Sequence, residues 1–402
     1  MLDHVRYLFY SHDGLGLGHA RRNLAVAAAL IDEAPEASVL LATSVDEIDR
    51  LGLPPNVDVL KLPGVRKLGN ERYAARRLPV SHEEIGGLRA ALLAAAVEQF
   101  RPGVMLVDKH PQGVGGELLP ALEILRSAGG RAVLGLRDVL DDRSAVLGEW
   151  SANGAAGLIS SYYERVLVYG DSVVLDPAEE YAFPPAVAER THLCGYVVTR
   201  GLDVSDRETT REATPGPARP RVLATAGGGE DGFKLLSTFV EAASGAGWEA
   251  FVVAGPQARE PERRKLRDLA QKAGVAFRRF VPNLADWFPL ADALVCMGGY
   301  NTLVEAVSSG TPTVCVPRVE PRSEQHIRAT AFARLGLVRV VEPDQLDAAR
   351  LRTEVQTTLR SSRRHLAERA HSALDFGGAR RAAGHLLETA LQPSELATAE
   401  TR

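Results

Sequence analysis

Residues 296–306 read Cys-Met-Gly-Gly-Tyr-Asn-Thr-Leu-Val-Glu-Ala, an apolar run that ends at two glycines before a polar helix start. Glycines at such a strand-to-helix turn let the backbone approach a ligand, and the free N–H groups of the helix favour a phosphate there. Either Asn301 or Thr302 can cap the helix, and Glu305 follows about one helical turn later. We therefore expect this turn to bind a phosphate, with the Glu305 carboxylate beside sugar hydroxyls.

Short apolar runs alternate with helical patterns on both sides of this turn. In the second half of the chain the predicted strands are 222–226, 250–254, 276–281, 293–297, 313–316 and 338–341. In the first half they are 5–10, 39–43, 57–62, 104–108, 131–136 and 166–169. Strands that alternate with helices are typical of parallel sheets. The predicted fold class is therefore α/β, with two Rossmann-like parallel-sheet domains.

A polar, proline-rich segment over residues 204–220 separates the two halves and has the composition of an interdomain linker. We expect the domains to span residues 1–200 and 221–376, joined by a linker over 201–220. A helix over 377–392 is expected to pack back toward the N-terminal domain, and residues 393–402 are expected to form a tail.

Composition excludes several classes of protein. The 402 residues carry a formal net charge of −4, so no global positive field exists to bind nucleic acid. The three cysteines are far apart in the sequence, which favours a reducing compartment over a disulfide or zinc scaffold. No apolar run is long enough to cross a bilayer and no leader sequence is apparent, so we expect a cytoplasmic protein without stable membrane insertion. The oligomeric state stays open.

The first strand-to-helix turn contains Gly14, Gly16 and Gly18, and His19 follows directly. A dinucleotide-binding fingerprint needs a glycine where His19 stands, and the second strand ends without the usual acidic residue. The pattern therefore argues against nicotinamide binding. A plain tight turn explains the glycines, whereas a histidine at this helix start faces the crevice above the sheet.

A second glycine-rich turn contains Gly227, Gly228 and Gly229. A Walker A loop needs a lysine directly after its last glycine, but Phe233 follows Gly232 here. Nucleotide hydrolysis of the Walker type is therefore disfavoured, and a glycine loop that lines a ligand cleft is expected instead.

The segments Gly298–Ala306, Gly310–Pro312 and Glu324-Gln325, together with Pro317, resemble the donor-binding half of GT-B nucleotide-sugar glycosyltransferases. The turn Gly14–His19 resembles the same superfamily, and the overall likeness is to the family 28 peptidoglycan-precursor N-acetylglucosaminyltransferases. The resemblance implies a GT-B fold whose two domains face each other across a cleft. It implies an acceptor-binding N-terminal domain and a C-terminal domain that binds a nucleotide sugar.

The resemblance also implies roles for donor-site residues. Main-chain groups of Phe280 and Val281 would bind the base, and Glu305 would bind the ribose. The diphosphate would lie at the Asn301-Thr302 helix start. Arg200 either compensates phosphate charge or is a solvated linker arginine. The remaining predicted donor contacts are Gly16, Gly18, Gly227, Gly228, Gly229, Gly298, Gly299, Arg318, Glu324 and Gln325, the last two toward sugar hydroxyls.

Glycosyl transfer needs a base for the acceptor hydroxyl and stabilisation of the leaving diphosphate. A histidine titrates near neutral pH, so His19 is the leading candidate base, with Asp13 as the alternative. No metal-ligand cluster is apparent, and helix N-termini with arginines can stabilise a diphosphate without one. The pair Asp141-Asp142 is interpreted as a helix cap.

The acceptor side has four candidate residues. Asp108 and Arg137 end predicted strands at the same edge of the sheet, although helix capping is an alternative for the acid. Arg72 and Arg76 belong to the basic segment Lys61–Arg77, which either contacts an acceptor phosphate or carboxylate or is a solvated loop.

The predicted function is transfer of a sugar from a nucleoside diphosphate sugar, UDP being expected, with inversion and without metal or other cofactor. The pairs Arg21-Arg22 and Tyr300-Asn301 depart from the cell-wall enzymes, which favours a small-molecule acceptor in natural-product or glycoconjugate biosynthesis. Two alternatives remain: a nucleotide-sugar hydrolase or epimerase on the same fold, and a non-catalytic nucleotide-sugar-binding protein.

Overall fold

The computed structural model describes residues 5–11, 18–46, 48–69, 72–199 and 219–392, and the chain divides into two compact units. The N-terminal unit runs to Val197 and also includes the chain from Gly377 onward, whereas the C-terminal unit spans Val198–Phe376. Most of the predicted linker and the whole predicted tail lie outside the described residues.

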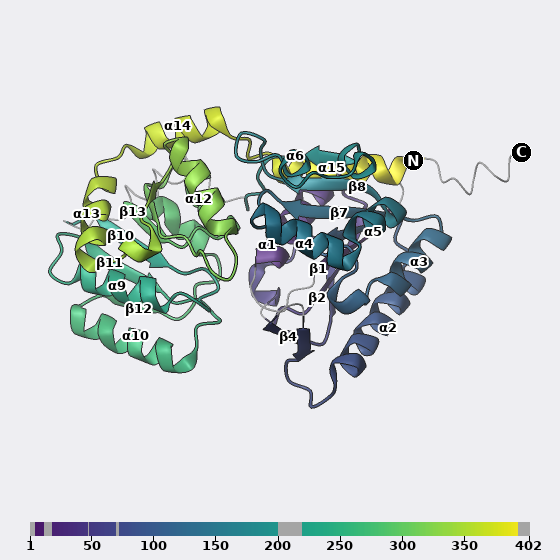
Figure 1. Ribbon diagram of the computed structural model, residues 1–402, viewed down its shortest axis with the longest axis horizontal. Coiled ribbons are helices and arrows are strands. Elements are labelled where there is room, and N and C mark those ends of the chain that lie inside the picture. Colours follow the sequence, from purple (N-terminus) through teal and green to yellow (C-terminus); the bar gives the residue numbers. More distant parts are fainter. Residues whose placement is uncertain (1–4, 12–17, 47, 70–71, 200–218, 393–402) are drawn as a thin grey trace, which may run out of the picture. The chain divides into compact units, whose positions relative to one another are not determined.

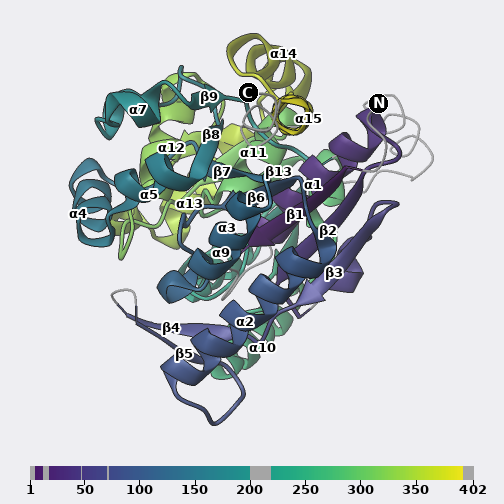
Figure 2. The ribbon, with the colours of Figure 1, turned by 90° about the vertical axis from the view of Figure 1, so that its right-hand side faces the viewer.

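The N-terminal unit (Figure 1) is built on a seven-stranded parallel sheet, whose strand order β3-β2-β1-β6-β7-β8-β9 can be followed in Figure 2. Strands β1 and β6 are almost entirely buried, as expected for a parallel sheet covered by helices on both faces. The strands are β1 (Arg6–Ser11), β2 (Ser38–Thr43), β3 (Val57–Lys61), β6 (Val104–Asp108), β7 (Arg131–Arg137), β8 (Tyr163–Tyr169) and β9 (Thr191–Leu193).

Helices connect these strands and form the core with them. Leu93 of α2 and Leu122 of α3 pack in one cluster with Leu8 and Tyr10 of β1. The helices of this unit are α1 (Gly18–Glu33), α2 (His82–Phe100), α3 (Leu119–Ser127), α4 (Arg143–Asn153), α5 (Ala155–Tyr162), α6 (Pro177–Glu180), α7 (Pro185–Ala188) and α15 (Gly378–Leu391), with 3-10 turns η1 (Ile48–Leu51) and η2 (Val114–Gly116). Asp142 caps α4 by accepting from the Ala145 N–H, so the predicted cap is confirmed.

The basic segment Lys61–Arg77, interpreted from its sequence as a loop, contains an antiparallel pair, β4 (Val65–Gly69) and β5 (Arg72–Ala75). Figure 2 shows this pair beside α2, and Val65, Tyr73 and Ala75 pack with Ile85 of that helix in a small core. The loop prediction was wrong because Val65, Tyr73 and Ala75 form an apolar face of the strand pair, and this face is buried on α2.

The C-terminal unit has a six-stranded parallel sheet with the order β12-β11-β10-β13-β14-β15. Its strands are β10 (Arg221–Thr225), β11 (Glu249–Val253), β12 (Ala276–Arg278), β13 (Ala293–Cys296), β14 (Thr313–Cys315) and β15 (Arg339–Val340). Its helices are α9 (Phe233–Ala243), α10 (Glu260–Ala273), α11 (Tyr300–Ser308), α12 (Glu324–Arg334), α13 (Ala348–Thr358) and α14 (Arg363–Ala373), with η3 (Leu284–Leu290) and η4 (Pro343–Gln345). Its core includes Val222, Val252 and Val295 from three adjacent strands.

Helix α15 returns the chain to the N-terminal unit, where it packs on α1. The Gly378 N–H donates to the Tyr196 carbonyl at 3.1 Å, and a Cβ at Gly378 would lie 2.4 Å from the Gly195 carbonyl oxygen. The start of the helix therefore fits only a glycine. Among the described residues, no helix combines the length and apolar character needed to span a bilayer.

A buried ion pair links α2 to the segment that precedes α3. Arg89 Nε lies 2.5 Å from Glu117 Oε2, and Arg89 Nη2 lies 2.7 Å from Glu117 Oε1. Glu117 also accepts from the Tyr10 hydroxyl, and both charged side chains are fully buried. The free-energy cost of burying these two charges is compensated only while both side chains are present.

We predict that Arg89→Met lowers the free energy of unfolding by about 3–5 kcal/mol, because it leaves the Glu117 carboxylate buried without its cation. Urea denaturation followed by circular dichroism measures the change. Arg364→Met, which breaks the exposed Arg364–Glu368 pair, is the control and should change stability by less than about 0.5 kcal/mol. Adding Glu117→Gln to Arg89→Met should restore part of the loss, and no restoration would contradict this view of the pair.

Two histidines lie where α15 meets β9. The rings of His192 and His385 have centroids 4.6 Å apart, and Arg165 Nη1 lies 2.8 Å from His385 Nδ1. Burial and the charge of Arg165 lower the pKa of His192, and burial, His192 and Arg165 lower that of His385. Glu388, which pairs with Arg165 at 2.8 Å, opposes these shifts only in part.

We predict that the protein loses stability as the pH falls below about 6.5, because the unfolded chain then binds protons at histidines that stay neutral in the folded state. Thermal unfolding between about pH 7.5 and 5.5 tests this. The double variant His192→Asn/His385→Gln should show a flatter pH dependence than the wild-type protein. Equal slopes for the two proteins would refute the assignment.

Candidate functional site

The N-terminal unit brings His19 and Asp108 together, although 89 positions separate them in the sequence. His19 is the second residue of α1, and Asp108 is the last residue of β6, level with the end of β1. His19 Nδ1 lies 2.9 Å from Asp108 Oδ2. Arg22, one turn further along α1, donates from Nη2 to both carboxylate oxygens at 2.6 and 2.8 Å.

Burial and charge decide the protonation of this cluster. The side chains of Asp108 and Arg22 are 0% and 2% exposed, whereas that of His19 is 16% exposed. Burial alone would raise the pKa of Asp108, but Arg22 and His19 outweigh it and hold that pKa well below its usual range. Asp108 is therefore a carboxylate that only accepts hydrogen bonds.

The tautomer of His19 follows from that charge. A ring nitrogen 2.9 Å from a carboxylate oxygen carries the hydrogen, so neutral His19 is protonated on Nδ1. Arg22 Nη2 also lies 3.0 Å from Nδ1, but it is closer to the Asp108 oxygens, at 2.6 and 2.8 Å, and a carboxylate can only accept hydrogen bonds. The other ring nitrogen, Nε2, is then the one that can accept a proton.

Two further predicted residues of the N-terminal unit, Gly18 and Arg137, lie near the carboxyl ends of the strands. Gly18 begins α1, and Arg137 is the last, half-buried residue of β7. Arg72 is in β5, but its side chain is outside the description, as are Asp13 and Gly16.

Arg76 belongs to a group of three cations that surround one carboxylate. Lys61 Nζ, Arg76 Nη1 and Arg77 Nη2 lie 3.0, 3.2 and 3.0 Å from the Asp46 carboxylate oxygens. Partial burial would raise the pKa of Asp46, but the hydrogen bond and charge of Lys61 and the charges of the two arginines lower it. Because Asp46 follows β2 and Lys61 ends β3, the group lies at the carboxyl edge that also holds Asp108. We call Lys61, Arg76 and Arg77 the cation cluster.

In the C-terminal unit, the Gly298-Gly299 turn joins β13 to α11. Gly298 has φ +82°, and a Cβ there would lie 2.8 Å from Cys315 Sγ, so the turn requires glycine. The helix cap is Gly299, and Asn301 and Thr302 lie in the first turn of the helix, so the predicted side-chain cap was wrong. Within the part of the chain that the structure describes, the N-terminus of α11 therefore has no hydrogen bond from a capping side chain.

Glu305 follows on α11 and is buried. Its Oε1 accepts from the Thr199 hydroxyl at 2.5 Å, so the carboxylate is held in place. Thr199 was not identified from the sequence, because a lone threonine between the two halves of the chain carries no pattern. The ribose role predicted for Glu305 stays a prediction.

The glycine turn after β10 lies against α11. Gly229 has φ +92°, and a Cβ there would lie 2.2 Å from the Ala254 carbonyl oxygen. A Cβ at Gly227 would lie 3.8 Å from Thr302 Oγ1. The predicted glycine loop and the predicted phosphate turn are therefore neighbours in space.

Arg318, which follows β14, contacts two other predicted donor residues and one residue that was not predicted. Its Nη2 lies 2.7 Å from Glu324 Oε1, and its backbone N–H donates to Gln325 Oε1 at 3.3 Å. Its Nη1 lies 2.9 Å from Asp231 Oδ2 in the glycine loop. Burial would lower the pKa of Arg318, but Glu324 and Asp231 outweigh it and raise that pKa above its usual value.

The predicted base contact, Phe280 and Val281, is not placed as expected. Strand β12 ends at Arg278, so Phe280 and Val281 lie in the following loop and not at a strand end. Arg200 lies outside the described residues.

Sequence reasoning missed Arg22 and Asp231 as members of the site. Arg22 was noted only as half of an unusual Arg-Arg pair, although its spacing of three from His19 places both on one face of a helix. Asp231 stands within the quoted glycine loop, but only the fold shows that it faces Arg318.

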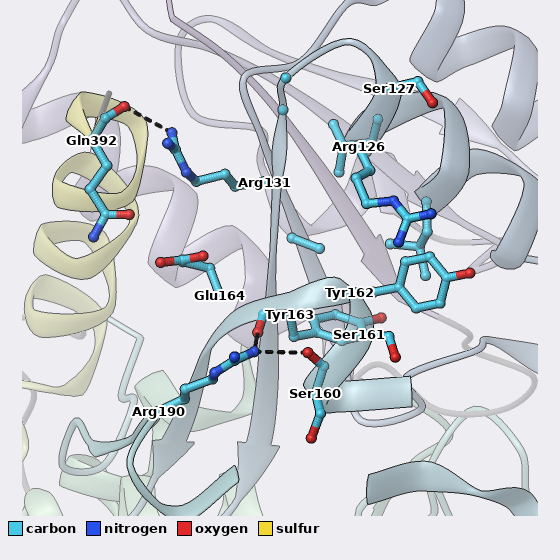
Figure 3. A pocket seen from close by; sticks show the side chains of 15 residues that line it. Arg126, Ser127, Arg131, Ser160, Ser161, Tyr162, Tyr163, Glu164, Arg190 and Gln392 are labelled. Atoms are coloured by element: carbon cyan, nitrogen blue, oxygen red, sulfur yellow. Dashed lines mark hydrogen bonds between the residues drawn. The ribbon is translucent and has the colours of Figure 1, made fainter. Parts of the chain in front are cut away.

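An open cavity of about 730 Å³ lies elsewhere, where β7 and β8 begin (Figure 3). Arg131 and Arg190 line it and donate to the carbonyls of Gln392 and Tyr163 at 2.9 and 2.8 Å. This is the opposite end of the strands from Asp108, so the cavity is not part of the candidate site. Within the described residues, no three His, Cys, Asp or Glu side chains are grouped to hold a metal ion.

Comparison with known proteins shows what the chain is similar to. Residues 226–384 match the glycosyltransferase family 28 C-terminal domain. A curated relative from Haemophilus ducreyi, UDP-N-acetylglucosamine--N-acetylmuramyl-(pentapeptide) pyrophosphoryl-undecaprenol N-acetylglucosamine transferase, is 24% identical over 77% of this chain and 85% of its own.

Two solved structures show the same fold over nearly the whole chain. Acinetobacter baumannii MurG is 15% identical with a TM-score of 0.59, covering 96% of this chain and 99% of its own. A UDP-glucosyltransferase from Polygonum tinctorium is 13% identical with a TM-score of 0.65, covering 97% and 99%. The two parallel sheets, the matched C-terminal domain and these likenesses agree: the chain is a glycosyltransferase with the GT-B fold, and over residues 226–384 it is similar to family 28.

Proposed function

We propose that the chain transfers a sugar from a UDP-sugar to a hydroxyl of an anionic acceptor, with inversion and without a metal ion. The observation that carries the proposal is the His19–Asp108 pair, which leaves Nε2 of a partly exposed imidazole as the proton acceptor. The hydrolase alternative needs the same base with water as nucleophile, and only turnover measurements separate the two.

The proposed step moves one proton and breaks one bond. The acceptor hydroxyl gives its proton to His19 Nε2 while its oxygen bonds to the anomeric carbon and the bond to the UDP oxygen breaks. The imidazolium that forms is stabilised by the Asp108 carboxylate, which stays ionised. A single displacement of this kind inverts the anomeric carbon.

The C-terminal unit is proposed to bind the donor. Its open helix N-terminus at Tyr300 offers N–H groups and a positive helix end to a diphosphate. Glu305, which already accepts from the Thr199 hydroxyl, would accept from the ribose hydroxyls. Glu324 Oε2 is buried and has no hydrogen-bond partner among the described residues, which suits a sugar hydroxyl.

The acceptor is proposed from charge. The cation cluster gathers three positive charges around the Asp46 carboxylate, and such a group can compensate a phosphate or diphosphate. The name of the Haemophilus ducreyi relative gives UDP-N-acetylglucosamine as its donor and a pyrophosphoryl-undecaprenol compound as its acceptor. These names favour an acceptor of that kind over the small molecule expected from the sequence, and UDP-N-acetylglucosamine is the first donor to test.

We predict that His19→Ala lowers kcat by about 10²–10⁴-fold, because the acceptor hydroxyl loses its base. Asp108→Asn should lower kcat by a comparable factor, because the imidazolium loses its carboxylate and the tautomer is no longer fixed. UDP release with and without acceptor measures turnover, and calorimetry should show UDP affinity changed by less than about threefold.

His365→Ala changes an exposed histidine of α14 and serves as the control, which should keep full activity. Full turnover by His19→Ala would remove the proposed base. UDP release that is equally fast without any acceptor would identify a hydrolase instead.

We predict that the double variant Arg76→Gln/Arg77→Gln raises KM for a diphosphate-bearing acceptor by about tenfold or more, while kcat changes little. The reason is that two of three charges that face the acceptor phosphate are removed. The increase should shrink at high salt, because these side chains are partly exposed. An unchanged KM would show that the cation cluster is only a solvated surface feature.

A further inference from the structure

The Asp231–Arg318 ion pair spans the predicted diphosphate position in the C-terminal unit. Strands β10 and β14 flank β13, and Thr225, Cys296 and Cys315 are in register at their carboxyl ends. Asp231 follows β10 and Arg318 follows β14, so their contact at 2.9 Å bridges over the end of β13. The Gly298-Gly299 turn and the start of α11 follow β13 directly.

The two carboxylates on Arg318 differ in their surroundings. Glu324 is 6% exposed and lies 2.7 Å from Nη2, whereas Asp231 is 43% exposed. A solvent-exposed ion pair contributes little free energy and is weakened by salt, whereas loss of a buried partner leaves an uncompensated charge. The Asp231 contact is therefore the one that can open.

Charge balance shows why it should open. Asp231, Arg318 and Glu324 together carry one net negative charge, which repels a diphosphate at the adjacent helix start. Once Asp231 withdraws, Arg318 and Glu324 form a neutral pair, and Arg318 Nη1 can donate to a phosphate oxygen. Arg318 Nε is also buried without a partner among the described residues, so the guanidinium has unused hydrogen-bonding capacity.

We propose that the Asp231 carboxylate binds Arg318 while the donor site is empty. When the nucleotide sugar binds, its diphosphate displaces Asp231 from Arg318. This proposal rests on the proposed function, since it assumes that the C-terminal unit binds a nucleoside diphosphate. It makes Asp231 a positioning residue that lowers donor affinity and keeps Arg318 oriented.

The test is the affinity for UDP, measured by calorimetry at low salt. Asp231→Asn keeps the shape of the side chain and removes its charge, so the Kd for UDP should fall about three- to tenfold. The matched control is Glu230→Gln, which removes the same charge from the neighbouring exposed residue and should change Kd by less than about twofold. Uridine, which lacks phosphates, should bind equally to wild type and Asp231→Asn.

A double-variant comparison assigns the effect to Arg318. Arg318→Met should weaken UDP binding, and adding Asp231→Asn to it should give no further gain, because the side chain for which Asp231 competes is gone. An unchanged or weaker affinity of Asp231→Asn, an equal gain in Glu230→Gln, or a gain that persists in Arg318→Met overturns the proposal. A wild-type protein that binds no UDP at all would instead overturn the proposed function, and this inference with it.

Discussion

The carboxylate of Asp108 is the constraint on which the N-terminal site depends. A fully buried carboxylate is tolerated only if its charge is compensated and its lone pairs are used, and Arg22 and His19 meet both needs. The same contacts fix the imidazole in one tautomer and one orientation. Arg22 is itself held by the Tyr169 ring, whose centroid lies 5.2 Å from its guanidinium carbon. Structural and chemical requirements therefore coincide at this pair.

The two units repeat one arrangement with different chemistry. In both, charged side chains follow the carboxyl ends of central parallel strands, where open α/β sheets bind ligands. In the N-terminal unit these are Asp108 and the cation cluster. In the C-terminal unit they are Glu305 and Arg318 with its two carboxylate partners, Asp231 and Glu324. In each unit, a partly exposed aspartate, Asp46 or Asp231, pairs with cationic side chains that could instead bind an anionic substrate. The proposed reaction assigns proton transfer to the first unit and donor binding to the second.

Local patterns made much of this predictable. Apolar runs identified most strands of both sheets, and Gly298 and Gly299 identified the turn that precedes α11. Long-range pairing was not predictable, because neither Arg22–Asp108 nor Asp231–Arg318 leaves a signal in one sequence. The β4–β5 pair was missed because a segment rich in basic residues is also typical of a solvated loop. The cap of α11 was misassigned because the helix begins at Tyr300, so that Asn301 and Thr302 lie inside it and Gly299 stands at the cap position.

The central claim is that Asp108 fixes His19 as a base protonated on Nδ1. Nitrogen-15 NMR of histidine-labelled protein, at a pH where the imidazole is neutral, reports which ring nitrogen carries the hydrogen. We predict a hydrogen on Nδ1 and a bare Nε2 for His19 in the wild-type protein, and a mixture of tautomers in Asp108→Asn. A hydrogen on Nε2 in the wild-type protein would contradict the account, because the nitrogen that must accept the acceptor's proton would already be occupied.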